Sequence, residues 1–195
     1  RFRPIAVISC YCQKPSMIIA SFAVAALAAQ SPNVAEDPRA TAGVAVFFDL
    51  CGSTVAKVET PVDPARFKFT KLSAETVNEI RPMSKGQPFW DVQDQQTELR
   101  ALVHIEANGV CAVEIVEASE AATRTQFANR LQALAGRLGG TLVPRPDKVK
   151  KVKGKPMTSS EWRIVTASQT FRAGLTTYPD ARFMTQHIAM LTEDR

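Results

Sequence analysis

The sequence predicts an α+β fold in which an antiparallel sheet carries a long helix on one face. Apolar residues that alternate on both sides of Asn108-Gly109 indicate a β-hairpin over 98–117. An apolar stripe at helical spacing follows from Ser119 to Leu138, and two to three further strands follow that helix. Strands that come in runs separated by one helix, instead of alternating with helices, favour an antiparallel sheet with the helix packed on its apolar face. Short helices are expected before the hairpin.

The first expected element is a helix over 41–52, because its apolar residues recur at helical spacing and a glycine stands at its end. A second short helix is expected over 73–81, with Ser73 as its N-cap and Pro82 closing it. Phe89-Trp90 follow, and we expect these aromatic side chains to close one end of the core.

Two registers compete for the hairpin. A two-residue turn would pair Ile105 with Ala112 and would place the Glu114 carboxylate on the apolar face. A three-residue turn, with Gly109 as a left-handed bulge residue, makes that face wholly apolar. Because a slip of one residue exchanges the two faces, burial should select the second register. Its expected pairs are Ile105 with Cys111, Val103 with Val113 and Ala101 with Ile115.

Ser119 is expected to cap the long helix and Gly139-Gly140 to end it. Its buried stripe should consist of Phe127, Leu131, Leu134 and Leu138. Later alternating segments predict strands over 161–168, 170–177 and 183–191, with 178–182 as a turn.

The 195 residues have ordinary globular composition, with 45% hydrophobic and 22% charged residues, and they amount to one domain. The modest Gly and Pro content excludes a collagen-like chain, and the apolar content is too high for bulk disorder. No apolar run reaches the roughly 18 residues that a membrane-spanning helix needs.

The first residues have the three parts of a secretory signal peptide: a basic start, an apolar stretch over 17–27, and small residues at 28 and 29. We therefore predict a signal peptide over 1–29, a flexible segment over 30–39 and a single α+β domain over 40–195. An N-terminal membrane anchor or a buried helix is the alternative, although the apolar stretch is short for spanning. A lipid-attached Cys10 is a weaker one. The protein is expected to be exported, either periplasmic or secreted, with no membrane span after cleavage.

Four cysteines are present, and two of them, Cys10 and Cys12, belong to the predicted leader. Cys51 and Cys111 remain, and an oxidising compartment would usually join them. Closing their 60-residue separation corresponds to about 4 kcal/mol of stabilisation in the chain-entropy description. Two buried free thiols are an alternative. A metal site is disfavoured, because neither cysteine has a CxxC or HxxxH companion.

The net charge of +5 comes from one segment, residues 145–155, which holds six cations and a single acid. The high isoelectric point therefore does not describe a generally basic surface. No aromatic residue interleaves the lysines and no recognition helix adjoins them, so we interpret the segment as a solvated, mobile loop and expect no specific nucleic-acid binding. Its candidate anion-binding residues are Lys148, Lys150, Lys151, Lys153 and Lys155.

The run Val46-Phe47-Phe48-Asp49-Leu50-Cys51-Gly52-Ser53-Thr54 resembles the opening strand of class III nucleotide cyclases. The resemblance would make Asp49 a metal ligand. It covers only this short segment, the family's second Gly-Asp motif does not follow, and Pro61 and Pro64 interrupt the place of its next helix. We therefore predict no metal site at Asp49.

The layout over 40–191 resembles that of small, uncharacterised exported proteins of proteobacteria. It consists of a Cys-bearing helix, a hairpin carrying Gly109-Val110-Cys111, a helix and terminal strands. The resemblance implies no known activity.

The sequence contains no nucleophile elbow, zinc-protease motif, phosphate-binding glycine pattern or paired carboxylates. His104 and His187 lie in alternating stretches and are interpreted as surface or second-layer residues. We therefore expect no enzyme, no cofactor and no metal. The expected function is a non-catalytic binding or structural role outside the cytoplasm, with an envelope protein as candidate partner. A small-molecule or anion-binding protein that uses the 145–155 lysines is the alternative.

Overall fold

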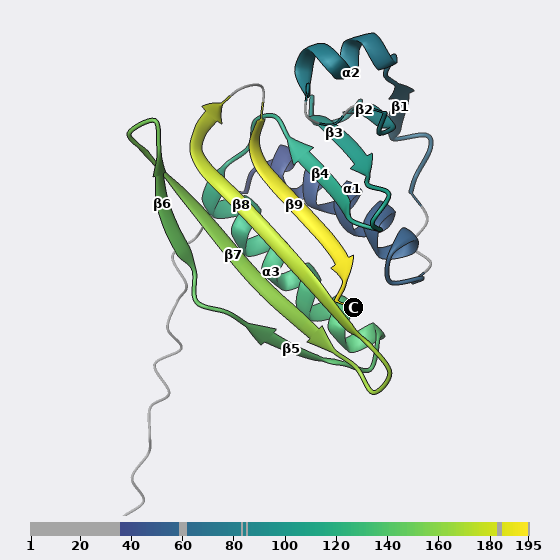
Figure 1. Cartoon of the computed structure of the whole chain (residues 1–195), viewed down its shortest axis with the longest axis vertical. Helices are drawn as coiled ribbons and strands as arrows, with labels where there is room; N and C mark the ends of the chain where they lie inside the picture. Colours follow the sequence, from purple (N-terminus) through teal and green to yellow (C-terminus); the bar gives the residue numbers. More distant parts are fainter. Residues whose placement is uncertain (1–35, 59–61, 83, 85, 183–184, 195) are drawn as a thin grey trace, which may run out of the picture. The chain divides into compact units, whose positions relative to one another are not determined.

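Figure 1 shows the computed structural model, which describes residues 36–58, 62–82, 84, 86–182 and 185–194. The predicted signal peptide, with Cys10 and Cys12, lies outside the described residues. The helices of the described chain are α1 (Pro38–Thr54), α2 (Ala74–Ile80) and α3 (Glu120–Arg137). The strands are β1 (Phe67–Lys71), β2 (Phe89–Asp94), β3 (Arg100–Ile105), β4 (Cys111–Ile115), β5 (Thr141–Pro144), β6 (Lys148–Val152), β7 (Lys155–Val165), β8 (Thr170–Arg182) and β9 (Thr185–Glu193).

Each helix begins where the sequence supplies a side-chain cap. Asp37 caps α1 by accepting a hydrogen bond from the Arg39 N–H (2.9 Å). The helix thus starts at Pro38, before the expected domain start at residue 40. Ser73 and Ser119 cap α2 and α3, as the sequence predicts.

The strands form one antiparallel sheet in the order β1-β2-β3-β4-β9-β8-β7-β5, and β6 also pairs with β7. Because β5 and β6 pair with successive parts of β7, the two together form one interrupted edge of the sheet. The last described strand, β9, lies between β4 and β8. The α+β antiparallel class is therefore confirmed, although the sheet is larger than the sequence predicts.

The main core lies between the sheet and the two helices on one of its faces, α1 and α3 (Figure 1). The predicted stripe of α3 is buried at Phe127, Leu131 and Leu134. The rings of Phe47, Phe48 and Phe127 join the two helices, with centroids 4.9 to 5.4 Å apart. Aromatic packing at such separations adds to the roughly 1.5 to 3 kcal/mol that full burial of one large apolar side chain contributes.

The hairpin of β3 and β4 has the register that burial was expected to select. Ile105 lies opposite Cys111, and Gly109 adopts a φ of +86°, which glycine tolerates best. Its three-residue loop is closed by the Glu106 N–H donating to the Val110 carbonyl (2.7 Å). The other two expected pairs, which include Val103 with Val113, are present as well.

A disulfide joins Cys51 of α1 to Cys111 of β4, with the Cα atoms 5.4 Å apart. Both residues are fully buried. The bond thus fixes the last turn of α1 against the apolar face that the bulged hairpin creates, which confirms the predicted pairing.

Strands β1 and β2 were not predicted from the sequence. Phe89 and Trp90, which were expected to close the end of the core, lie in β2. Phe89 belongs to a small second cluster with Val77 and Leu102, where α2 covers the opposite face of the sheet. The short Phe-Lys-Phe-Thr-Lys alternation of β1 was too weak a signal, because edge strands carry few buried residues.

Two loop assignments were wrong. Residues 148–155 are not a loop, because they form the strand β6, a tight turn and the start of β7. The turn residues Lys153 and Gly154 have φ values of 49° and 81°, the left-handed pair typical of a two-residue hairpin. Residues 178–182 are not a turn either, because β8 continues through them to Arg182, with an irregularity in its pairing with β9.

The bulged register turns Glu114 away from the main core, but the carboxylate is not solvated, because it is buried beneath α2. The Arg81 Nε donates to its Oε1 (3.1 Å), Arg81 Nη2 contacts its Oε2, and the Thr185 hydroxyl donates to Oε2 (2.7 Å). His104 is also buried and stacks on Phe89, with ring centroids 4.5 Å apart. Burial lowers the pKa of His104, and the nearby Glu114 opposes this shift. These polar groups hold α2 to the sheet.

Candidate functional site

The five candidate lysines lie on the hairpin of β6 and β7 and are all exposed. Strand alternation divides them between the two sheet faces. Lys148 and Lys150 lie opposite Ser159 and Met157, on the face away from α1 and α3, whereas Lys151 points to the other face. Lys153 is in the turn and Lys155 begins β7. The structure therefore does not gather the five lysines into one cluster.

Part of the positive charge of the hairpin is already paired. Lys155 forms an ion pair with Asp180, and Arg145 Nε lies 3.4 Å from Glu161 Oε1. Lys148, Lys150 and Lys151 have no ion-pair partner among the described residues. Exposed lysines on a sheet edge also discourage pairing with another sheet, which is a purely structural role.

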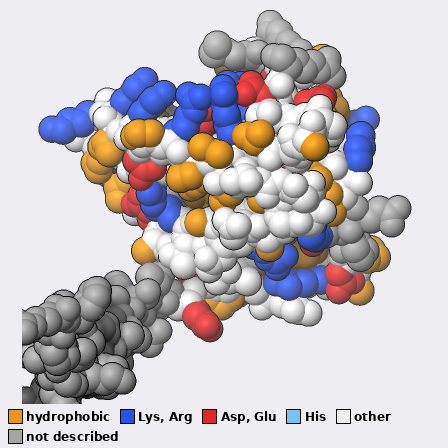
Figure 2. All heavy atoms as spheres, turned by 90° about the horizontal axis from the view of Figure 1, so that it is seen from below, with side chains coloured by type: hydrophobic (Ala, Val, Ile, Leu, Met, Phe, Trp, Pro, Cys, Tyr) orange, Lys and Arg blue, Asp and Glu red, His pale blue; other side chains and the backbone are white. Residues whose placement is uncertain are grey.

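Beside these lysines, the sheet face formed by β7, β8 and β9 carries no helix (Figure 1). Met190 is 38% exposed there, and its side chain covers Gly174, where an added Cβ would lie 3.1 Å from Met190 Cγ. Figure 2 shows Lys and Arg side chains gathered along one margin of the molecule with hydrophobic side chains beside them. From the strand pairing we define the basic face as the helix-free side of β6 to β9, which carries Lys148, Lys150, Met157, Ser159, Arg163, Arg172, Gly174, Thr176, Ile188 and Met190 and also the acidic Glu161.

The basic face adjoins a shallow hollow of about 230 Å³ between the interrupted edge and β7, whose lining includes Arg145, Asp147, Lys148, Ser159 and Glu161. Its charges are mixed. The nearby Ser160 hydroxyl, and next the ion pair with Arg124, holds the pKa of Asp147 below its usual value. Asp147 therefore stays ionised and weakens the attraction of the hollow for an anion.

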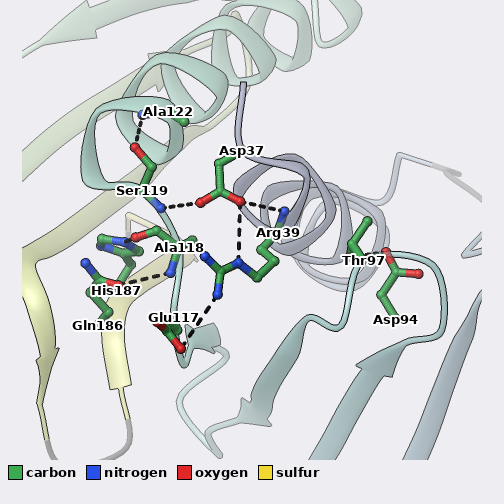
Figure 3. Close-up of polar contacts among 10 residues, drawn as sticks. All are labelled: Asp37, Arg39, Asp94, Thr97, Glu117, Ala118, Ser119, Ala122, Gln186 and His187. Carbon is green, nitrogen blue, oxygen red and sulfur yellow. Dashed lines mark hydrogen bonds and ion pairs between the residues drawn. The ribbon is translucent and has the colours of Figure 1, made fainter. Parts of the chain in front are cut away.

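Figure 3 shows a polar junction where the N-termini of α1 and α3 meet β9. The Asp37 carboxylate accepts hydrogen bonds from the backbone N–H groups of Arg39 (2.9 Å) and Ser119 (2.5 Å). Although burial opposes ionisation, these bonds hold the pKa of Asp37 below its ordinary value. Arg39 extends the junction to Glu117, with Nη1 3.6 Å from Oε2. Sequence reasoning missed Asp37 because it placed 30–39 in a flexible segment, although an Asp-Pro pair before an apolar run is a helix-start signal.

His187 lies at the same junction and is fully buried, not at the surface or in a second layer as expected. Its Nε2–H donates to the Ala118 carbonyl (2.9 Å), which fixes the tautomer. Its Nδ1 is buried and has no hydrogen-bond partner in the described part of the chain. Burial lowers the pKa of His187, and the Ala118 carbonyl only partly opposes this. The neutral ring thus serves to position the start of α3 against β9.

Asp49 lies within α1 and not at the end of a strand, so the structure removes the geometry that the cyclase resemblance implies. Its carboxyl is half-buried, and burial raises its pKa. Across 36–58, 62–82, 84, 86–182 and 185–194, no three His, Cys, Asp or Glu side chains cluster in a way that could hold a metal.

Comparisons with protein-family models, with curated proteins and with solved structures find no match for this chain. Within the described helices, none is both long and apolar enough to cross a membrane.

Proposed function

We propose that this chain is an exported domain that acts by binding an acidic protein partner in the cell envelope through its basic face. The observation that carries the proposal is the half of the sheet over β7, β8 and β9, which has no helix over it (Figure 1). Arg172 of β8 lies on this half, and Lys148 and Lys150 lie beside it on β6; none of the three has a carboxylate partner among the described residues. Unpaired cations on an open surface attract a surface of opposite charge and speed its approach.

Two features support a place outside the cytoplasm. Residues 1–29 have the organisation of a signal peptide, and the mature chain carries the Cys51–Cys111 disulfide, a bond that persists in oxidising compartments. The two features are independent, because the leader pattern contains neither of these cysteines.

The makeup of the basic face suits protein binding better than catalysis. Met157 and Met190 offer flexible apolar contacts, and Arg172 can bind a carboxylate with two hydrogen bonds, whereas Arg163 Nη2 already lies 3.1 Å from Asp194 Oδ2. Arginine and methionine are enriched in protein interfaces, whereas lysine is usually found at their rim. The titratable groups that are strongly buried, such as Glu114 and His187, are used in holding helices to the sheet.

The export part is tested by the intact mass of the protein recovered from the envelope fraction of cells that produce it. The expected species begins at Ala29 or Gln30 and is two hydrogens lighter than its reduced form. Recovery of the uncut chain alone, from the cytoplasm, would contradict export.

The binding part is tested by photo-cross-linking from two neighbouring positions. A photoreactive residue at position 150 should give a cross-linked product in the envelope, whereas the same residue at 151, on the opposite sheet face, should not. Lys150→Glu should weaken binding of the identified partner about tenfold by charge repulsion, and Lys151→Glu should leave it within about threefold. Equal cross-linking from both positions, or from neither, would contradict binding through the basic face.

A small anion is the second candidate ligand, favoured by the hollow beside Lys148 and Ser159. Titration with inorganic phosphate should then shift the amide resonances of these two residues, and Lys148→Ala should remove the shifts. The mixed charge of the hollow, with Asp147 and Glu161 in its lining, makes this candidate weaker than a protein partner.

A further inference from the structure

The edge of the sheet opposite the lysine hairpin carries a second surface, which is independent of the basic face. Strand β1 ends the strand order, so one side of its backbone has no neighbouring strand in the described structure. Four of its five residues, Lys68 to Lys71, are exposed. The unpaired backbone groups of such an edge are a template on which another strand can pair, and its exposed lysines disfavour strands that carry no acidic residues.

The hydrogen-bond pattern identifies the backbone groups that face outward. The Leu72 N–H donates to the Phe89 carbonyl of β2 (2.9 Å). Hydrogen-bonded pairs in an antiparallel ladder recur at every second residue, so Thr70 directs its N–H and C=O toward β2. Phe69 and Lys71 therefore direct theirs away from β2, where an added strand would lie.

An apolar hollow lies next to this edge on the helix side of the sheet. Its volume is about 200 Å³, and it is lined by Leu50, Thr54, Phe69, Trp90, Val103 and Ile105. Phe69 is 37% exposed, so its ring still offers apolar surface to a neighbour. Pockets for small ligands usually measure about 300 to 1,000 Å³, so this hollow suits one apolar side chain better than a free ligand. Side chains on an adjacent strand reach diagonal neighbours, which brings the hollow within range of an added strand.

The charge of the edge selects the kind of partner. No Asp or Glu occurs between Asp63 and Glu75, whereas Lys68 and Lys71 lie on β1 itself. A second copy of β1 would add two more lysines and no carboxylate to this edge, which like-charge repulsion disfavours. A strand with acidic residues would instead place opposite charges together.

We propose that β1 accepts an extended, acidic segment of a partner protein as an additional strand of the sheet. Main-chain hydrogen bonds form with Phe69 and Lys71, one apolar side chain of the segment enters the hollow beside Trp90, and carboxylates on the other face of the segment lie near Lys68. This mode of recognition takes affinity from the backbone and specificity from the pocket and the charges.

The test uses a synthetic peptide of alternating Glu and Leu residues and a control peptide in which Lys replaces each Glu. Binding is followed by the amide resonances of Phe69 and Lys71 and by tryptophan fluorescence in a Trp162→Phe background, in which Trp90 is the remaining tryptophan of the sequence. Lys71→Pro removes one outward N–H but no hydrogen bond to β2, and Lys71→Ala is its control because it removes only the side chain. Thermal unfolding shows whether each variant keeps its fold, and Phe69→Ala tests the hollow independently of the backbone.

The acidic peptide should bind the wild type and shift both amides, and the basic peptide should not bind. Lys71→Pro should weaken binding at least about tenfold, Lys71→Ala by no more than about fivefold, and Phe69→Ala by about tenfold. No binding of the acidic peptide, equal binding of both peptides, or equal loss in Lys71→Pro and Lys71→Ala would overturn the proposal. Self-association of the wild type that Lys71→Pro abolishes would assign the edge to a second copy and also overturn it. None of these substitutions changes a residue of the basic face, so a negative result would not contradict the proposal that the basic face binds a partner.

Discussion

Replacing Cys51 and Cys111 together by alanine is expected to lower the free energy of unfolding by about 2 to 4 kcal/mol. The bond closes a sequence separation of 60 residues, for which the chain-entropy relation gives about 4 kcal/mol at 25 °C. Measured losses are usually somewhat smaller, because the denatured chain retains structure. Both residues are fully buried, so alanine is preferred to serine, whose hydroxyl would be buried without a partner.

The assay is urea unfolding followed by far-ultraviolet circular dichroism and by tryptophan fluorescence. The double variant should keep its helix and strand signals and unfold at a lower urea concentration with a cooperative transition. Reduced wild type serves as the control and should resemble the double variant. A loss below about 1 kcal/mol, or two titratable thiols in the unfolded, unreduced protein, would refute the reasoning, since the packing of α1 on β4 would then not depend on the bond.

Three further changes test other parts of the structure. Asp37→Ala should cost about 2 to 4 kcal/mol in urea unfolding, because it removes the cap of α1 and the bond to Ser119, whereas Glu36→Ala should cost little. The folded-state pKa of the buried His187 is below its unfolded value of about 6.5, so its contribution to stability is present above that pH and is lost as the pH falls toward the folded pKa. The urea concentration at the unfolding midpoint should therefore decrease as the pH is lowered below about 6.5, and it should decrease less steeply in His187→Gln. Gly43→Ala places a Cβ 2.7 Å from Ile115 Cδ1 and should lower the free energy of unfolding by about 1 kcal/mol, since overpacking outweighs the gain in helix propensity. Adding Ile115→Val to this variant should restore part of the lost stability. A Gly43→Ala variant that is more stable than the wild type would contradict the close approach.

The elements that the sequence predicted well are those with a strong local signal and a buried face. The hairpin register followed from its pattern, because only the pairing of Ile105 with Cys111 leaves one face apolar. The long helix followed from its Ser119 cap and its apolar stripe. The prediction of the disulfide depended on the hairpin register, since this register turns Cys111 toward the face on which α1 packs.

The elements that were missed depend on contacts between distant parts of the chain. Residues 148–152 form a strand because β7 lies beside them, and their lysines carry little strand propensity of their own. Glu114 is buried because Arg81 arrives from α2 to pair with it. The candidate lysines were read as one cluster, whereas alternation places Lys150 and Lys151 on opposite faces. As long as this segment is interpreted as a loop, its residues cannot be assigned to the two faces of a sheet.

The position of β9 in the sheet determines when during folding the sheet can be completed. Since β9 lies between β4 and β8, the strands β1 to β4 and the strands β5 to β8 remain two separate groups until β9 pairs with both. If the chain is exported as proposed, with its N-terminus first, β9 leaves the membrane after the other described strands. Ile115 must then find His187 far along the chain, and pairing over such a separation is slow. Until that moment the apolar surfaces of both groups are exposed, so premature release or loss of β9 should give an aggregation-prone intermediate instead of a smaller folded domain.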